Sequence, residues 1–353
     1  MFNFFRFGKF SFAAALACGL CIDFALGAER LPPYGADLSQ TSVSGISSGA
    51  AMALQFHVAH SGIVTGAGII AGVPYDCAEQ SSNRATHNCM KPDADHPVPN
   101  SAHLKEITDA LARSGAIDDI GNLANARVWL FSGRKDEVVL PPVMDATRGY
   151  YALYTPGDHI QYRNDIDAGH AMVTEDYGNK TCSANAAPFI VDCDFDAAKA
   201  LLEQIYGPLE APSVAPAGKY VEFDQKEFLA DGNAYNHSLS DVGYAYIPHA
   251  CALQSCRVHV ALHGCQQQAA AIGDGFYKHA GYNRWADTNR IIVLYPQTIS
   301  RWGWGWPFYT FNFVLNPNAC WDWWGYDSAD YHTKKGPQIV ALRAMVDRLA
   351  TKP

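Results

Sequence analysis

The sequence predicts an α/β protein in which a mostly parallel central sheet is covered by helices on both faces. Three observations lead to this prediction. Short apolar runs typical of strands alternate with amphipathic runs typical of helices along the chain of 353 residues. A Pro-rich stretch near the middle is not followed by a self-contained second pattern. A Gly-x-Ser-x-Gly motif stands where the first expected strand turns into the first expected helix.

Residues 1–28 have the features of a secretory signal peptide. Basic Arg6 and Lys9 precede an apolar stretch, and small residues end at Ala28, after which we place the cleavage site. A poor lipoprotein box ending at Cys18 is the alternative. Residues 29–353 then form a single domain of about 325 residues. No later stretch is apolar for long enough to span a membrane.

The expected elements can be placed in chain order. Residues 77–99 are polar and rich in Pro, Asn and Asp, which indicates a surface excursion. The expected helices are Gly49–His60, a helix from Leu104 to Gly115, Val143–Tyr154, Phe195–Tyr206, one long helix over Ala269–Thr288, and Gln338–Leu349. The expected strands are a short one through Thr41 and Val43, then Ile63–Gly72, Arg127–Phe131, Ile160–Arg163, Tyr244–Ile247, Val258–Leu262 and Ile291–Tyr295.

Charge and cysteine usage limit the function classes. The net charge of −9 and the lack of a Lys/Arg cluster argue against a nucleic-acid partner. Eight cysteines remain after the leader, and an even number behind an export signal favours disulfides. Three pairs are local, and the fourth is the long one; the predicted pairs are Cys77–Cys89, Cys182–Cys193, Cys251–Cys256 and Cys265–Cys320. The alternative, a metal site, lacks the usual ligand spacings.

The Gly45-x-Ser47-x-Gly49 motif predicts a nucleophile elbow. In that device a strand turns sharply into a helix and exposes a serine, and both glycines avoid collisions with the neighbouring backbone. A chance match in a Ser- and Gly-rich loop is the alternative. The strand before the motif and the helix after it favour a catalytic Ser47.

A serine hydroxyl needs a base to take its proton and an acid to orient that base. Asp136 and His170 each follow an expected strand end, where a sheet presents side chains to a site. Singly, each is explained by an ordinary surface position. Together, the order Ser47, Asp136, His170 matches that of an α/β hydrolase. Asp165 and Asp167 are rival acids, ranked lower because they share a loop with His170.

The oxyanion needs backbone N–H donors, and one of them should be Ser48, the residue after the nucleophile. The other donor usually comes from a His-Gly loop that precedes the nucleophile. Here the His263-Gly264-Cys265 loop follows the histidine of the triad. That order is expected if the fold is circularly permuted, with part of the sheet supplied by the C-terminal third. A turn glycine without a catalytic role is the alternative.

These motifs together resemble extracellular poly(3-hydroxybutyrate) (PHB) depolymerases, in particular the group with an N-terminal lipase box and a circularly permuted α/β-hydrolase fold. The matching segments span nearly the whole mature chain; they are residues 44–50, Gly72-Val73-Pro74-Tyr75, residues 132–136, Ala168-Gly169-His170, Leu262-His263-Gly264-Cys265 and residues 320–325. The resemblance implies Ser47 as nucleophile, Asp136 as acid, His170 as base, and the amides of Ser48 and Cys265 as the oxyanion hole.

The resemblance also implies an aromatic-lined substrate crevice. Two Trp-rich loops are candidates for it, and their members are Trp302, Trp304, Trp306, Trp321, Trp323 and Trp324. Aromatic residues most often fill cores, which is the alternative explanation. The alternation of Trp302, Trp304 and Trp306 with glycines is unlike a core strand. The family often carries a separate polymer-binding domain, and we do not expect one here, because the single domain expected over residues 29–353 leaves no room for it.

The sequence therefore predicts a secreted serine esterase that cleaves polyester or oligoester bonds of 3-hydroxybutyrate, without a cofactor and as a monomer. The enzyme alternative is an esterase for feruloyl or acetyl groups on plant polysaccharide. The non-enzyme alternative is a secreted binding protein that kept the fold, against which the complete Ser47, Asp136 and His170 set argues.

Overall fold

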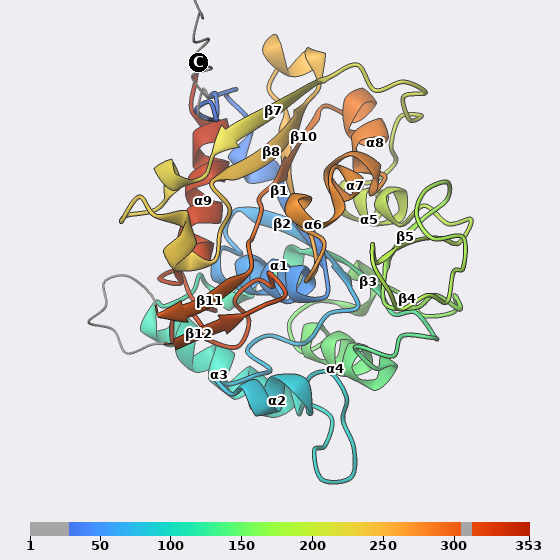
Figure 1. Ribbon diagram of the computed structural model, residues 1–353, viewed down its shortest axis with the longest axis vertical. Coiled ribbons are helices and arrows are strands. Elements are labelled where there is room, and N and C mark those ends of the chain that lie inside the picture. The colour runs from blue at the N-terminus through green and yellow to red at the C-terminus, as the bar shows by residue number, and fades with distance from the viewer. Residues whose placement is uncertain (1–27, 305–312) are drawn as a thin grey trace, which may run out of the picture.

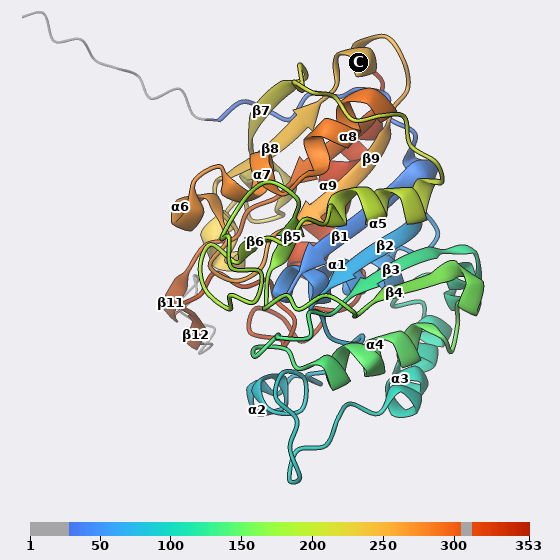
Figure 2. The same ribbon diagram turned by 90° about the vertical axis from the view of Figure 1, so that its right-hand side faces the viewer.

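The structure is a computed structural model that describes residues 28–304 and 313–353. An eight-stranded sheet runs through the molecule in the order β4-β3-β2-β1-β9-β10-β8-β7 (Figures 1 and 2). Its strands are β1 Thr41–Ile46, β2 Val64–Ile70, β3 Arg127–Phe131, β4 Ile160–Arg163, β7 Lys219–Asp224, β8 Val242–Ile247, β9 Arg257–Leu262 and β10 Ile291–Tyr295. The first six strands in that order, from β4 across to β10, are parallel to one another. β8 is antiparallel to β10, and β7 is antiparallel to β8.

The two halves of the chain meet at the centre of the sheet. β1 pairs in parallel with β2 on one side and with β9 on the other, so strands from residues 41–163 and 219–295 form one continuous sheet. This arrangement explains why the Pro-rich stretch at 208–216 does not begin a separate domain. The predicted fold class, a permuted α/β-hydrolase fold with a mostly parallel sheet, is confirmed.

Helices cover both faces of this sheet (Figure 2). α1 Ser48–Ala59, α3 Ser101–Ser114, α4 Pro141–Tyr151 and α9 Pro337–Ala350 lie on one side, and α5 Ala197–Tyr206 and α8 Tyr282–Asn289 lie on the other. A hydrophobic core lies on each face of the sheet, and alternate side chains of a buried strand pack into one core or the other. In β3, Val128 and Leu130 enter the core under α1, while Trp129 and Phe131 enter the core under α5.

Two predictions about elements differ from the structure. The long helix expected over residues 269–288 is divided into α6 Ala269–Ile272, α7 Gly275–His279 and α8. Gly273 and Gly281 interrupt it, because their φ angles of 60° and 93° cannot continue a right-handed helix. Part of the first aromatic loop is a hairpin, formed by β11 Arg301–Trp304 and β12 Phe313–Asn316.

Short elements without a strong periodic signal were not predicted. They are α2 Ser82–Thr86 in the polar excursion, the pair β5 Met172–Thr174 and β6 Ile190–Asp192, and the edge strand β7. The proposed signal peptide lies outside the described residues, apart from its last residue.

Candidate active site

Ser47 stands at the sharp turn between β1 and α1. Its φ of 57° and ψ of −123° are unusual for a residue with a side chain. A Cβ atom on Gly45 would lie 2.2 Å from the Gly49 carbonyl oxygen, and one on Gly49 would lie 2.4 Å from the His263 carbonyl oxygen. Both glycines of the motif are therefore required by close backbone contacts, as a nucleophile elbow demands.

Asp136 and His170 lie side by side although they come from different loops. His170 Nδ1 is 2.9 Å from Asp136 Oδ2, and both side chains are buried. The other oxygen of Asp136 accepts the backbone N–H groups of Val138 and Val139, at 2.8 and 2.9 Å. With Nδ1 held by the carboxylate, Nε2 is the nitrogen of His170 that remains for proton transfer.

The rival acids point away from this pair. Asp165 binds Arg163 at 2.5 Å and Asp167 binds Arg134 at 2.8 Å, and both carboxylates are more than half exposed. Neither contacts His170 among the interactions of the described residues. The geometry thus supports Asp136 as the acid.

The two proposed oxyanion donors face the same pocket as Ser47. Ser48 is the first residue of α1, where helix amide groups have no intrahelical acceptor and the helix dipole favours negative charge. Cys265 lies three residues after the end of β9, the strand that pairs with β1. Its amide and that of Ser48 donate to no acceptor within the described part of the chain. Both are therefore available to a developing oxyanion.

His263 and Gln267 hold the candidate oxyanion loop, His263-Gly264-Cys265, in place. His263 Nδ1 donates to the Gly264 carbonyl at 2.7 Å, and its Nε2 accepts the Thr298 N–H at 3.2 Å. Burial lowers the pKa of His263 to about 4, so the ring stays neutral and keeps both bonds. Gln267 Oε1 accepts the Gly264 N–H at 2.7 Å. Sequence reasoning did not assign roles to His263 and Gln267; their only signal was their place beside the His-Gly loop.

A pocket of about 450 Å³ contains the candidate nucleophile and base. Its apolar lining residues include Val73, Ala85, Met90, Val138 and Val139. Its lining also includes four residues with amide side chains that are hydrogen-bonded within the protein, Gln266, Gln267, Asn316 and Asn318. A cavity with many apolar lining residues suits a substrate that carries alkyl groups.

The six predicted substrate-binding tryptophans are distributed unevenly around this pocket. Trp323 and Trp324 line it, and their rings meet edge to face with centroids 5.5 Å apart. Trp321 is fully buried and donates to the His263 carbonyl at 2.9 Å, so it supports the oxyanion loop and does not face the pocket. Trp302 is 61% exposed on β11, outside the pocket lining. Trp306 and the side chain of Trp304 lie outside the described residues.

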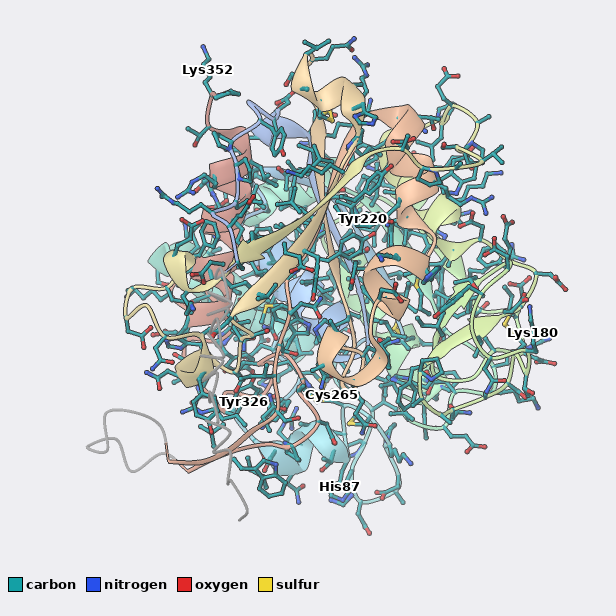
Figure 3. All side chains as sticks on the ribbon, turned by 45° about the horizontal axis from the view of Figure 1, so that its top comes forward. His87, Lys180, Tyr220, Cys265, Tyr326 and Lys352 are labelled. Carbon is teal, nitrogen blue, oxygen red and sulfur yellow. A yellow bond between two sulfur atoms is a disulfide. The ribbon has the colours of Figure 1, made fainter. Side chains whose placement is uncertain are left out.

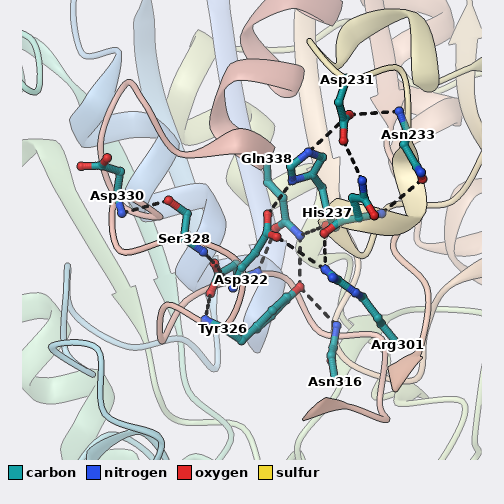
Figure 4. Close-up of polar contacts among 12 residues, drawn as sticks. Asp231, Asn233, His237, Arg301, Asn316, Asp322, Tyr326, Ser328, Asp330 and Gln338 are labelled. Carbon is teal, nitrogen blue, oxygen red and sulfur yellow. Dashed lines mark hydrogen bonds and ion pairs between the residues drawn. The ribbon is translucent and has the colours of Figure 1, made fainter. Parts of the chain in front are cut away.

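A buried polar network supports the loop that carries Trp323 and Trp324 (Figure 4). The Asp322 carboxylate accepts four backbone N–H groups, those of residues 325 to 328, at 2.8 to 3.2 Å. Burial, aided by the nearby Asp327 carboxylate, raises the pKa of Asp322 to about 7 although these amides oppose the rise. The Asn316 side chain makes two hydrogen bonds with the backbone of Cys320: it accepts the N–H and donates to the carbonyl, both at 2.9 Å. The side chains of Asp322 and Asn316 therefore hold the backbone of this pocket wall in place.

Four disulfides join cysteines of the described residues, and they form the same pairs that the spacing predicts: Cys77–Cys89, Cys182–Cys193, Cys251–Cys256 and Cys265–Cys320. Cys265 is labelled in Figure 3. Among the residues described, no three His, Cys, Asp or Glu side chains come close enough together to hold a metal ion. No helix in the described ranges is long and apolar enough to cross a membrane.

The fold and this arrangement of serine, histidine and aspartate define a serine hydrolase of the α/β class. No family model matches the chain. It is 45% identical to a poly(3-hydroxybutyrate) depolymerase of Delftia acidovorans, over 99% of this chain and 67% of that protein. It is 32% identical to a polyhydroxybutyrate depolymerase of Talaromyces funiculosus, over 92% of this chain and 94% of that protein. The chain belongs to the PHB depolymerase family and is a carboxylic ester hydrolase.

Solved structures agree with this assignment. The crystal structure of the PHB depolymerase from Penicillium funiculosum has a TM-score of 0.80 and 31% identity, and covers 91% of this chain and 98% of its own. A PHB depolymerase complexed with R3HB trimer has a TM-score of 0.81 and 30% identity over the same shares. The disulfides of this chain are consistent with an exported protein.

Proposed function

We propose that this protein hydrolyses ester bonds of poly(3-hydroxybutyrate) or its oligomers through an acyl-enzyme on Ser47. The observation that carries the proposal is the convergence of three loops. Ser47 and His170 face one pocket, and His170 is bound to Asp136 at 2.9 Å. Family membership and the R3HB trimer bound to a related structure support the choice of substrate.

The residues divide the reaction between them. Ser47 Oγ attacks the ester carbonyl while His170 Nε2 takes its proton, and Asp136 stabilises the imidazolium that forms. The amides of Ser48 and Cys265 receive the negative charge of the tetrahedral intermediate. His170 then protonates the leaving hydroxybutyrate alkoxide, and a water activated by the same histidine releases the acyl group from Ser47. These steps need no cofactor.

The wider setting is part of the proposal. The leader-like start and the disulfides support secretion to the periplasm or the outside, after removal of residues 1–28 from a single catalytic domain at 29–353. The net charge of −9 supports the absence of a nucleic-acid partner. We expect the enzyme to act as a monomer.

The test is turnover of two soluble esters side by side. The protein should hydrolyse 3-hydroxybutyrate trimer and leave methyl ferulate unchanged. The reverse preference would point to a carbohydrate esterase. If a fluorophosphonate labels Ser47 but neither ester is hydrolysed, Ser47 is a reactive nucleophile and the proposed substrate class is wrong.

A further inference from the structure

We propose that Asn185 is a positioning residue that holds the acid and the base of the candidate triad in register. The inference rests on the proposed function, because it concerns how Asp136 and His170 are aligned for that reaction. Asn185 does not line the pocket, so it acts through other residues and not on the substrate. It lies in the segment that the Cys182–Cys193 disulfide closes.

The side chain of Asn185 uses all of its hydrogen-bonding capacity. Its Oδ1 accepts the backbone N–H of His170 at 2.8 Å and that of Glu137 at 3.0 Å. Its Nδ2 donates to the carbonyl oxygens of Lys135 at 2.8 Å and Ser183 at 3.1 Å. A primary amide has two acceptor sites and two N–H donors, so every site is filled. Two N–H and two C=O partners also fix which end of the amide is oxygen.

Three of these four partners frame the acid and the base. Lys135 and Glu137 are the residues before and after Asp136, and the third partner is the amide of His170 itself. One side chain therefore spans the acid residue and reaches the backbone of the base. The backbone bond from Lys135 N–H to the Ala168 carbonyl, at 2.9 Å, also joins the two loops, but it does not involve His170.

The position of Asn185 is itself fixed by close packing. The Gly169 N–H donates to the Cys182 carbonyl at 2.9 Å, and a Cβ atom on Gly169 would lie 2.2 Å from the Ala184 carbonyl oxygen. The segment thus presses directly against the backbone before His170. Four residues after Asn185, the ring of Phe189 meets the His170 ring edge to face, with centroids 6.2 Å apart. We call the four hydrogen bonds of the Asn185 side chain the Asn185 clamp. The segment that carries this clamp contacts the backbone before His170 and the ring of His170 itself.

Loss of the clamp should lower kcat more than it changes KM. The pocket lining would stay intact, whereas the carboxylate and imidazole would lose their shared support. A displacement of about 1 Å among catalytic groups can cost on the order of 10²-fold in rate. We expect Asn185→Ala to reduce kcat for 3-hydroxybutyrate trimer by about 10- to 100-fold, with KM changed by less than about threefold.

The matched control is Asn179→Ala. Asn179 also bonds a nearby backbone amide, that of Thr181 at 2.9 Å, and it lies three residues before Cys182 without a bond, within the described ranges, to the loops of Asp136 or His170. Its loss should leave kcat unchanged. If Asn185→Ala does not fold, Asn185→Asp takes its place: it keeps the two acceptor bonds and loses the two donors.

A double-mutant cycle with Asp136→Asn separates positioning from general structural support. If Asn185 acts through the acid–base pair, its effect on kcat disappears once Asp136→Asn has removed that pair's function. An equal loss in both backgrounds, or a kcat of Asn185→Ala within about twofold of wild type, would overturn the proposal. The rate of fluorophosphonate labelling is measured for the same variants. This rate tests the clamp even if the trimer is not the substrate, so the two proposals fail separately.

Discussion

The disulfide between Cys265 and Cys320, whose Cα atoms are 4.3 Å apart, joins the candidate oxyanion loop to the loop that carries Trp323 and Trp324. Cys265 provides a proposed oxyanion donor, and Trp321, directly after Cys320, donates to the carbonyl of His263. The bond therefore stands between two parts of the site that come from distant stretches of the chain, at a sequence separation of 55.

Removal of this bond should affect both stability and turnover. In the chain-entropy model, closing a loop of this length stabilises the fold by about 4 kcal/mol. A displaced oxyanion donor costs about 10²- to 10³-fold in turnover. We expect Cys265→Ala/Cys320→Ala to unfold at lower temperature and to be slower while still folded. The control Cys251→Ala/Cys256→Ala should lose stability alone. Unchanged turnover of the folded Cys265/Cys320 variant would make that bond a structural link only.

Asp136→Asn should reduce kcat by about 10⁴-fold, because an amide cannot hold the required tautomer or stabilise the imidazolium. Thermal stability should change little. Asp167→Asn is the control, since that carboxylate is 59% exposed and bonded to Arg134. A larger catalytic loss for Asp167→Asn or Asp165→Asn than for Asp136→Asn would show that the acid has been misassigned.

The candidate triad could be proposed from the sequence because each member follows an expected strand, and the strand before Asp136 has the clearest sequence signal. β3, for example, was placed at its observed bounds, and it carries Asp136 just beyond its end. The supporting residues were not predictable. Asn185 bonds backbone groups 15 to 50 residues away around the candidate acid and base, and Gln267 donates to carbonyl oxygens 78 and 79 residues away. No local pattern reports such contacts. The aromatic loops were ambiguous for the same reason, since only the tertiary fold separates the buried Trp321 from the pocket-lining Trp324.

Trp324→Ala should raise KM for 3-hydroxybutyrate trimer by about tenfold, equivalent to about 1.4 kcal/mol, and lower kcat less. The reason is the loss of an apolar wall of the pocket. Trp302→Ala, at an exposed position outside the pocket, should leave both constants for the soluble trimer unchanged. Equal effects of the two substitutions would contradict this assignment of the substrate wall.

Three buried histidines should make the fold less stable in acid. Burial lowers the pKa of His57 to about 3, of His259 to about 3 and of His263 to about 4, from an ordinary value of 6.5. Below pH 6.5 the unfolded chain therefore binds protons that the folded chain does not. The stabilising contribution is complete above that pH and is lost progressively as the pH falls through the folded pKa values of about 3 to 4.

Denaturant unfolding at a series of pH values measures this dependence. Each such histidine adds up to about 1.4 kcal/mol per pH unit to the slope. His259 is bonded to Ser42 and Ser44 at 2.6 and 2.7 Å, so His259→Gln should lower stability at pH 7 and also make the slope between pH 6 and 4 shallower. A slope identical to that of wild type would show that His259 does not remain neutral in the fold.

Turnover of 3-hydroxybutyrate trimer by Ser47→Ala, compared with Ser48→Ala, is the most direct test of the proposed mechanism. Ser47→Ala should lose on the order of 10⁴-fold or more in kcat while it remains folded. Ser48→Ala should keep most of the activity, because alanine retains the backbone amide that Ser48 contributes. A nearly silent Ser47→Ala together with a severe Ser48→Ala would contradict the assignment of Ser47 as the nucleophile.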